Sequence, residues 1–417
     1  MCKIKHLPLH LMPNKILFIS IDGMTDPLGQ SQVLPYLIGL SEKGYKINIA
    51  SCEKEINLKR HKDIINSIVS KHSITWSYCF YQTKIPFVSQ IQNYLNLKRT
   101  VDRIVKDNTT ILHCRSYLPA LIGLQLKRKH ANKFIFDMRG FWADERIDGN
   151  IWHLRNPLHK ILYNYFKRKE IELIEKADYV VTLTNNAKRE IELWKLKPMP
   201  KIKVIPCCVD LNHFVLKNNE DKINNRNKLD IVQNSYVVGY LGSLGTWYML
   251  DEMFDFFKEL HEKKTNSIFF FITNDKEQDI RNVAESKGIL PECIIVKSAK
   301  REDVPNYISC LDIGLFFIKP LYSKKGSSPT KLAELLAGGI PIITNTGVGD
   351  VDELILRTNC GILVSSFNKE EYKDAMDKIQ TLNTGKQYYR NIALTNFSLK
   401  KGIESYSMIY DYLTADK

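Results

Sequence analysis

The residues best suited to chemistry gather in one short segment of the C-terminal half. Ser328 and Thr330 precede a run with helical apolar spacing, where they can cap the first turn. The free N–H groups and the positive dipole end of such a helix attract an anion such as a phosphate. Lys331 adds a charge that the dipole disfavours unless an anion lies nearby. Glu334 follows on nearly the same face and can accept hydrogen bonds from a ribose diol. A surface Lys–Glu pair on an ordinary helix would show the same pattern.

Two glycine-bearing loops are further candidates for contact with a phosphate. Gly29 and Gln30 follow an expected first strand at residues 15–22, although a glycine in such a turn also serves conformation alone. Gly242 and Ser243 lie in a GxxGxxG run that opens the second half of the chain. The spacing is not GxGxxG, and no acidic residue ends a strand about 20 residues later. This disfavours a nicotinamide dinucleotide and leaves other phosphate ligands open.

The elements that must position these residues alternate between strand and helix. A nearly continuous apolar run at residues 15–22 predicts a strand covered on both faces, followed by a loop at 23–32 and a helix at 33–44. The alternation continues to about residue 207 and restarts after a polar stretch at 216–235. We therefore expect an α/β protein with two Rossmann-like domains, whose ligands lie in a cleft at the carboxyl ends of both sheets.

Composition narrows the class of partner without choosing one. The formal net charge of +14 favours nucleic acid, anionic lipid or a phosphorylated ligand, or serves only solubility. The nine cysteines are scattered, with no CxxC pair, which indicates a reduced, cytoplasmic protein without a structural zinc site. The histidines form no metal motif, so we expect no metal site. No apolar run of about 18 residues predicts a membrane-spanning helix, and the first fifteen residues lack the pattern of a signal peptide.

Five segments in fixed order resemble one enzyme family. Residues 176–191, 203–214 and 328–355 resemble the motifs before the hinge, at the hinge and at the nucleotide sugar in family 4 retaining glycosyltransferases of the GT-B fold. Residues 26–37 together with 136–149 resemble a branch linked to bacterial surface polysaccharides. The joint occurrence of the segments is specific, although each alone is not.

The resemblance implies a division of labour between the domains. Residues 1–207 would bind the acceptor, a glycan or a lipid-linked glycan. Residues 208–393 would bind the nucleotide-diphosphate sugar, UDP- or GDP-linked, with Glu334 on the ribose. Residues 394–417 would form a helix that crosses back to the first domain. The donor is a substrate, and neither a cofactor nor a metal is implied.

The chain departs from the family pattern at two donor positions. Gly326 stands where the family commonly has an acidic residue that contacts the donor sugar. The usual Arg and Lys pair after the first strand of the second domain is missing near Gly245. Lys324, Lys325 or Lys331 would have to supply that charge.

The acceptor side also departs from the pattern. Arg139 and Gly140 replace a frequent His-Asp dipeptide, and we expect Arg139 to face the cleft and steady the phosphate or the acceptor. Asp144 and Glu145 would bind acceptor hydroxyls or assist as a base. Alternatively, both form salt bridges with Arg139 and Arg146. At the hinge, cysteines stand where Asn-Gly is usual.

The resemblance gives a reaction and leaves alternatives. The sugar would transfer with retention of configuration, the leaving phosphate accepting the proton of the acceptor hydroxyl. A basic amphipathic helix at residues 157–177 could rest on an anionic inner leaflet, or be an ordinary packed helix. A catalytically silent GT-B scaffold and a nucleotide-sugar epimerase remain alternatives. A nucleic-acid-binding protein is suggested by charge alone, because no nucleic-acid-binding motif is present.

Overall fold

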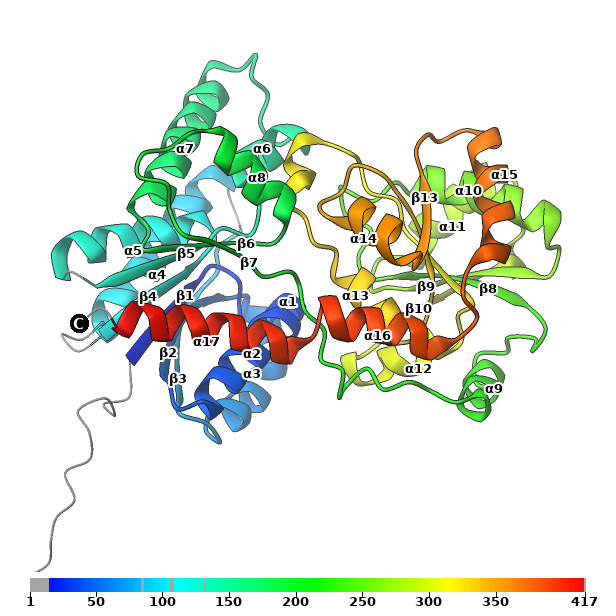
Figure 1. Cartoon of the computed structure of the whole chain (residues 1–417), viewed down its shortest axis with the longest axis horizontal. Coiled ribbons are helices and arrows are strands. Elements are labelled where there is room, and N and C mark those ends of the chain that lie inside the picture. Colours follow the sequence, from blue (N-terminus) through cyan, green and yellow to red (C-terminus); the bar gives the residue numbers. More distant parts are fainter. Residues whose placement is uncertain (1–14, 84–85, 106–108, 131, 416–417) are drawn as a thin grey trace, which may run out of the picture.

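The computed structural model describes residues 15–83, 86–105, 109–130 and 132–415. The chain forms two α/β domains joined side by side, each a parallel sheet with helices on both faces (Figure 1). The expected fold class, two Rossmann-like domains facing across a cleft, is confirmed.

The N-terminal sheet has seven parallel strands in the order β3-β2-β1-β4-β5-β6-β7. Its strands are β1 (Lys15–Ser20), β2 (Lys46–Glu53), β3 (Ile74–Phe80), β4 (Thr109–Arg115), β5 (Lys133–Asp137), β6 (Tyr179–Thr182) and β7 (Ile202–Val204). Its helices are α1 (Pro27–Gln32), α2 (Leu34–Glu42), α3 (Glu55–Val69), α4 (Pro86–Ile104), α5 (Tyr117–His130), α6 (Trp142–Asp148), α7 (Pro157–Lys176) and α8 (Asn185–Leu193). Strands β1, β4 and β5 are almost wholly buried, as the apolar runs predict, whereas the edge strands β3 and β7 are mostly half-buried.

The C-terminal sheet has six parallel strands in the order β10-β9-β8-β11-β12-β13. They are β8 (Tyr236–Leu241), β9 (Ser267–Ile272), β10 (Ile294–Lys297), β11 (Ile313–Leu315), β12 (Ile342–Asn345) and β13 (Gly361–Val364). The helices are α9 (Asn219–Asn227), α10 (Leu250–Lys263), α11 (Glu277–Ser286), α12 (Val304–Ser309), α13 (Thr330–Ala337), α14 (Val351–Thr358), α15 (Lys369–Lys378) and α16 (Lys386–Asn396), with 3₁₀ turns η2 (Pro291–Cys293), η3 (Arg301–Asp303), η4 (Tyr322–Gly326) and η5 (Ile379–Thr381).

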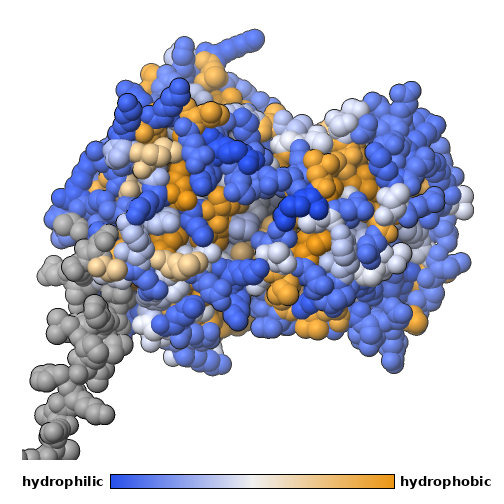
Figure 2. Space-filling model, in the orientation of Figure 1, coloured by the Kyte–Doolittle hydropathy of each residue, from blue (hydrophilic) through white to orange (hydrophobic). Residues whose placement is uncertain are grey.

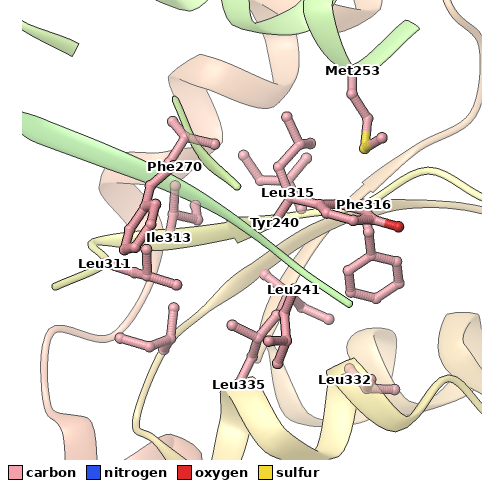
Figure 3. Close-up of a cluster of buried hydrophobic side chains, with 14 of the residues drawn as sticks. Tyr240, Leu241, Met253, Phe270, Leu311, Ile313, Leu315, Phe316, Leu332 and Leu335 are labelled. Carbon is pink, nitrogen blue, oxygen red and sulfur yellow. The ribbon is translucent and has the colours of Figure 1, made fainter. Parts of the chain in front are cut away.

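A dense apolar core fixes helix α13 against this sheet. Leu332 and Leu335 of α13 lie on one side of the strands, and Met253 of α10 lies on the other (Figure 3). Gly314 on β11 allows the close approach, because a Cβ there would lie 2.6 Å from Leu335. The core therefore aims the N-terminus of α13 toward the space between the domains.

The last helix returns to the N-terminal domain, as the fold class predicts. Helix α17 (Leu399–Ala415) packs on α2 (Figure 1). Its Tyr410 hydroxyl lies 2.6 Å from Nδ1 of His113 on β4. The two segments that connect the domains are hydrogen-bonded to each other: the N–H of Val209 donates to the carbonyl of Phe397 over 2.7 Å.

One local prediction is wrong. Residues 27–32, expected within a loop, form helix α1. Asp26 takes the extended cap position and Pro27 the first turn, a pattern that starts a helix as readily as a turn.

Candidate functional site

A cleft of about 520 Å³ lies between the two domains, at the carboxyl ends of both sheets. Figure 2 shows the surface indented between the domains. Residues from both domains line the cleft, among them Asp22, Lys54, Arg115, Arg139, Trp142, Arg146, Cys207, Trp247, Tyr248, Lys324, Ser327, Ser328 and Thr330. Five of these side chains are cationic, so the cleft is suited to a ligand with several negative charges.

The start of helix α13 forms one wall of the cleft. Ser327, Ser328 and Thr330 all line it. The Ser328 hydroxyl accepts a hydrogen bond from the N–H of Cys207 over 3.1 Å, which ties the helix start to the hinge. No side chain caps α13 among the described residues, so the prediction that Ser328 and Thr330 cap its first turn is wrong. The N–H of Leu332 donates to the carbonyl of Pro329 over 3.2 Å, whereas no partner is found in the described part of the chain for the N–H groups of Thr330 and Lys331.

Lys331 is a buried cation without a polar partner. Its side chain is 4 % exposed, and Nζ makes no hydrogen bond within the described part of the chain. The ammonium lies 3.7 Å from the ring centre of Tyr240 and 3.4 Å from that of Tyr248. Burial lowers the pKa of Lys331 well below its usual range, although Glu334 and Asp275 oppose this shift.

Glu334 lies one helical turn from Lys331. Its side chain is half-buried, and no hydrogen bond or ion pair of its carboxylate is found among the described residues. Burial raises the pKa of Glu334 to about 7, against the charges of Arg301 and Lys331. Its oxygens are free to accept hydrogen bonds from a ligand.

The loop after β8 approaches the same place. Gly242 has φ +91°, a conformation that favours glycine, and a Cβ there would lie 3.9 Å from Nζ of Lys331. The Ser243 hydroxyl donates to Asp275 over 3.2 Å, and the N–H of Leu244 donates to the same carboxylate over 2.6 Å. The fold therefore brings Gly242 and Lys331 together, while Asp275 holds Ser243. None of these residues lines the cleft itself, nor does Glu334, whereas Thr330 at the start of α13 does.

The N-terminal domain contributes a cationic floor to the cleft. Arg139 lines the cleft, with φ +63° and an ion pair to Asp137 at 3.7 Å. Arg115, at the end of β4, donates to the cleft residue Asp22 over 3.1 Å. Burial alone would raise the pKa of Asp137, but the charges of Arg139 and Arg115 lower it to about 2. Asp137 therefore remains ionised beneath the two guanidinium groups.

Asp144 and Glu145 do not line the cleft. Asp144 is buried and accepts from Tyr163 and Lys167, each over 2.8 Å. Glu145 accepts from Lys324 of the other domain over 3.1 Å. Both carboxylates form ionic contacts, as the alternative interpretation expected, but with these lysines rather than with Arg139 and Arg146.

Gly29 and Gln30 also lie outside the cleft lining. Gly29 is buried inside α1, where a Cβ would lie 2.0 Å from the carbonyl oxygen of Gly23. The amide of Gln30 donates to the carbonyl of Thr25 over 3.0 Å. These residues shape the loop before α1, whereas Leu28 of the same helix reaches the cleft.

The absence of an acidic side chain at position 326 has a steric reason. A Cβ on Gly326 would lie 3.0 Å from Cα of Gly140, so the two domains meet backbone to backbone here. Lys324, two residues earlier, lines the cleft with its ammonium 3.5 Å from the ring centre of Trp247. Lys325 instead pairs with Glu190 over 2.8 Å and does not line the cleft.

Sequence reasoning missed two residues of the floor, Arg115 and Asp22. Each follows or ends a strand at the carboxyl edge of the sheet, the position at which parallel sheets bind ligands. Reading every charged residue at strand ends would have found both.

Two further findings concern metals and membranes. No group of three or more His, Cys, Asp or Glu side chains suited to hold a metal ion occurs in the part of the chain that the structure describes. Within the same residues, no helix has both the length and the apolar character needed to cross a bilayer.

Comparisons with known proteins agree with the fold. Residues 36–213 match the family model "Glycosyltransferase Family 4", and residues 221–393 match "Glycosyl transferases group 1". No match is found among curated proteins.

Solved structures of similar fold cover nearly the whole chain. Sucrose-phosphate synthase from Thermosynechococcus elongatus has a TM-score of 0.73 at 14% identity, covering 97% of this chain and 100% of that one. HepE from Anabaena, in complex with UDP and glucose, has a TM-score of 0.67 at 14% identity, covering 95% and 99%. WaaG, a glycosyltransferase involved in lipopolysaccharide biosynthesis, has a TM-score of 0.65 at 14% identity, covering 93% and 98%. With its N-terminal domain matching family 4 and its C-terminal domain matching group 1, the chain is a glycosyltransferase of the GT-B type.

Proposed function

We propose that the protein transfers a sugar from a nucleotide-diphosphate sugar to a glycan or lipid-linked acceptor, with retention of configuration, in the synthesis of a cell-surface polysaccharide. The observation that carries this proposal is the start of α13, which faces a cleft lined by five cationic side chains. Free N–H groups at a helix start and clustered cations are the features that bind a diphosphate. UDP is the favoured nucleotide, because HepE of similar fold is known in complex with UDP.

The donor would lie on the C-terminal domain, residues 208–393. Glu334 would accept hydrogen bonds from the ribose diol, and Lys331 would pair with the diphosphate. An anion beside the Lys331 ammonium would offset the cost of burying that charge, which tyrosine rings alone only partly offset. Lys324, held near Trp247, would supply charge that the family usually draws from an Arg and Lys pair.

The acceptor would enter from the N-terminal domain, residues 1–207, with residues 394–417 completing it. Asp22 would bind an acceptor hydroxyl, because it lines the cleft and Asp144 does not. Asp26 also lines the cleft, but its carboxylate is already held by Lys54 and Asn57. Arg139 would steady the phosphate or the acceptor from the floor.

The reaction would proceed on one face of the donor sugar. The bond between the anomeric carbon and the diphosphate oxygen breaks as the bond to the acceptor oxygen forms. The leaving phosphate accepts the proton of the acceptor hydroxyl, and the cations of the cleft stabilise its developing charge. This chemistry requires no cofactor and no metal ion.

Thermal unfolding against UDP-, GDP- and ADP-sugars tests the donor assignment. A donor that binds the folded state raises the Tm by mass action. We expect one nucleotide class to raise it in the wild type and to lose this effect in Glu334→Ala. If no donor shifts the Tm, a catalytically silent scaffold becomes the better interpretation. NMR of the product anomer tests retention, and an inverted product would refute the mechanism.

A further inference from the structure

A second cavity, an apolar groove of about 620 Å³, opens from the catalytic cleft into the N-terminal domain. It lies between helices α4, α5, α6 and α7. Gln90, Leu118, Trp142 and Arg146 line both the cleft and the groove, so the two spaces are continuous. Its volume lies within the range of about 300–1,000 Å³ typical of pockets for small ligands.

Aromatic and aliphatic side chains form the groove. The ring of Trp142 packs against Phe166 at 4.7 Å and against Trp152 at 5.5 Å between ring centres. Ile151 and Leu158 also line it, yet they are 50 % and 54 % exposed. Large apolar side chains that gather around one hollow and stay exposed to water indicate a surface that a ligand covers.

A single cation marks the junction between groove and cleft. The Arg146 guanidinium lies 4.6 Å from the ring centre of Trp142 and makes no hydrogen bond or ion pair within the described residues. Burial lowers the pKa of Arg146, with Glu145 opposing the shift. At the outer rim, by contrast, Arg128 and Lys169 are both paired with Glu172. The one free charge therefore lies where an anionic headgroup would meet the cleft.

We propose that this groove binds the hydrocarbon chain of a lipid-linked acceptor, whose phosphate headgroup pairs with Arg146. The inference rests on the proposed function and assigns it a definite acceptor class. The apolar lining suits a hydrocarbon chain, the unpaired guanidinium suits a phosphate, and the continuity with the cleft brings the acceptor hydroxyl to the donor. A membrane leaflet would instead contact the outer face of α7, for example Ile161, which is 62 % exposed and lines no part of the groove.

The test uses dodecyl diphosphate as the probe and inorganic diphosphate as its headgroup control, both measured by titration calorimetry below the micelle concentration. The variants are Leu158→Glu in the groove, Arg146→Gln at the junction and Ile161→Glu as a matched control on the same helix. Leu158 and Ile161 are both exposed, so neither change threatens the fold. We expect dodecyl diphosphate to bind at least tenfold more tightly than inorganic diphosphate. Leu158→Glu and Arg146→Gln should each weaken the probe at least tenfold, whereas Ile161→Glu should change it less than twofold.

Three outcomes would overturn the inference. Equal affinities for dodecyl diphosphate and inorganic diphosphate would show that the hydrocarbon chain of the probe contributes nothing to binding. Equal losses in Leu158→Glu and Ile161→Glu would indicate adsorption to the outer face of α7 instead. A wild-type affinity retained in Leu158→Glu would exclude the groove. Donor-induced shifts of the Tm, measured on the same variants, report separately on the proposed function.

Discussion

Arg139 of the N-terminal domain and Lys331 of the C-terminal domain are two cations near the cleft with opposite surroundings. Arg139 of the N-terminal domain pairs with Asp137, and its second guanidinium nitrogen donates to Cys207 over 3.4 Å. Although burial opposes the charge, Asp137 raises the pKa of Arg139. Among the described residues, the ammonium of Lys331 in the C-terminal domain has the rings of Tyr240 and Tyr248 as neighbours and no hydrogen-bond partner, and burial lowers its pKa.

This difference distinguishes a cation that stabilises the fold from a cation that binds a ligand. A buried pair is costly to break, because the remaining charge is left alone in a poor solvent. A buried lysine without a counter-ion already bears that cost in the free protein, where burial lowers its pKa, and an anionic ligand would stabilise its charged form. We therefore infer that Arg139 stabilises the floor of the cleft and that Lys331 is neutralised by the donor.

The largest expected effect comes from breaking the pair in the N-terminal domain. Arg139→Met should lower the free energy of unfolding by about 3 kcal/mol, the lower end of the cost of breaking a buried pair, because Asp137 loses one of two guanidinium partners and keeps Arg115 at 3.8 Å. Urea denaturation measures the loss. Adding Asp137→Asn to the same protein should recover part of it, and a double variant no more stable than Arg139→Met would contradict the pairing.

The matching change in the C-terminal domain should act on binding instead. Lys331→Met keeps the apolar stem between the tyrosine rings and removes the charge, so the free protein should be as stable as the wild type or more so. The Kd for the nucleotide-sugar donor should rise about a hundredfold, or about 2.7 kcal/mol. Urea denaturation measures the stability of the free protein, and titration calorimetry measures the Kd for the donor. If Lys331→Met were much less stable than the wild type in the absence of donor, Lys331 would stabilise the fold as Arg139 does, and the difference between the two cations would not hold.

The titration of Glu334 should make the free energy of unfolding depend on pH, with an effect of intermediate size. Between its ordinary pKa of 4.5 and the raised value of about 7, the folded protein holds a proton that the unfolded chain releases. The free energy of unfolding should therefore fall as the pH rises through this window. At pH 8, Glu334→Gln should be more stable than the wild type by on the order of 2 kcal/mol, and at pH 4.5 the two should be alike. Donor affinity should rise over the same window in the wild type only, because the ionised carboxylate is the better acceptor.

The smallest effect is expected at an exposed ion pair between the domains. Lys325 pairs with Glu190 over 2.8 Å, and the lysine side chain is 45 % exposed. Lys325→Ala should change the free energy of unfolding by less than about 1 kcal/mol and leave the donor Kd unchanged. A loss of donor affinity equal to that of Lys331→Met would show that Lys325, rather than Lys331, neutralises the diphosphate.

The sequence predicts the fold well because parallel strands and capped helices have local signatures. The strand–helix alternation and the two sheets follow from such patterns, whereas the return of helix α17 to the first domain was implied by the family resemblance alone. At the site, Ser328 and Thr330 line the cleft, but neither caps α13 as their capping chemistry predicts.

The parts that escape prediction depend on contacts between distant segments. Asp144 turns from the cleft because Lys167 and Tyr163 of α7 bind it. The surroundings of Lys331 come from Tyr240 and Tyr248, about ninety positions earlier in the chain. Nothing in the sequence around Gly29 indicates that the backbone of Gly23 packs against it. No local sequence pattern predicts these contacts, because they form only when distant segments pack together in the folded protein.

Proton uptake on donor binding tests the central claim most directly. At pH 8.5 Glu334 is already ionised, so Lys331 is the group near the donor that can take up a proton when a diphosphate arrives. Titration calorimetry with the donor identified by the Tm panel, in buffers of different ionisation enthalpy, measures this uptake. We expect proton uptake in the wild type, because a diphosphate raises the pKa that burial has lowered, and none in Lys331→Met. Equal uptake in both proteins, or tight binding with none in either, would contradict the assignment of Lys331 to the diphosphate.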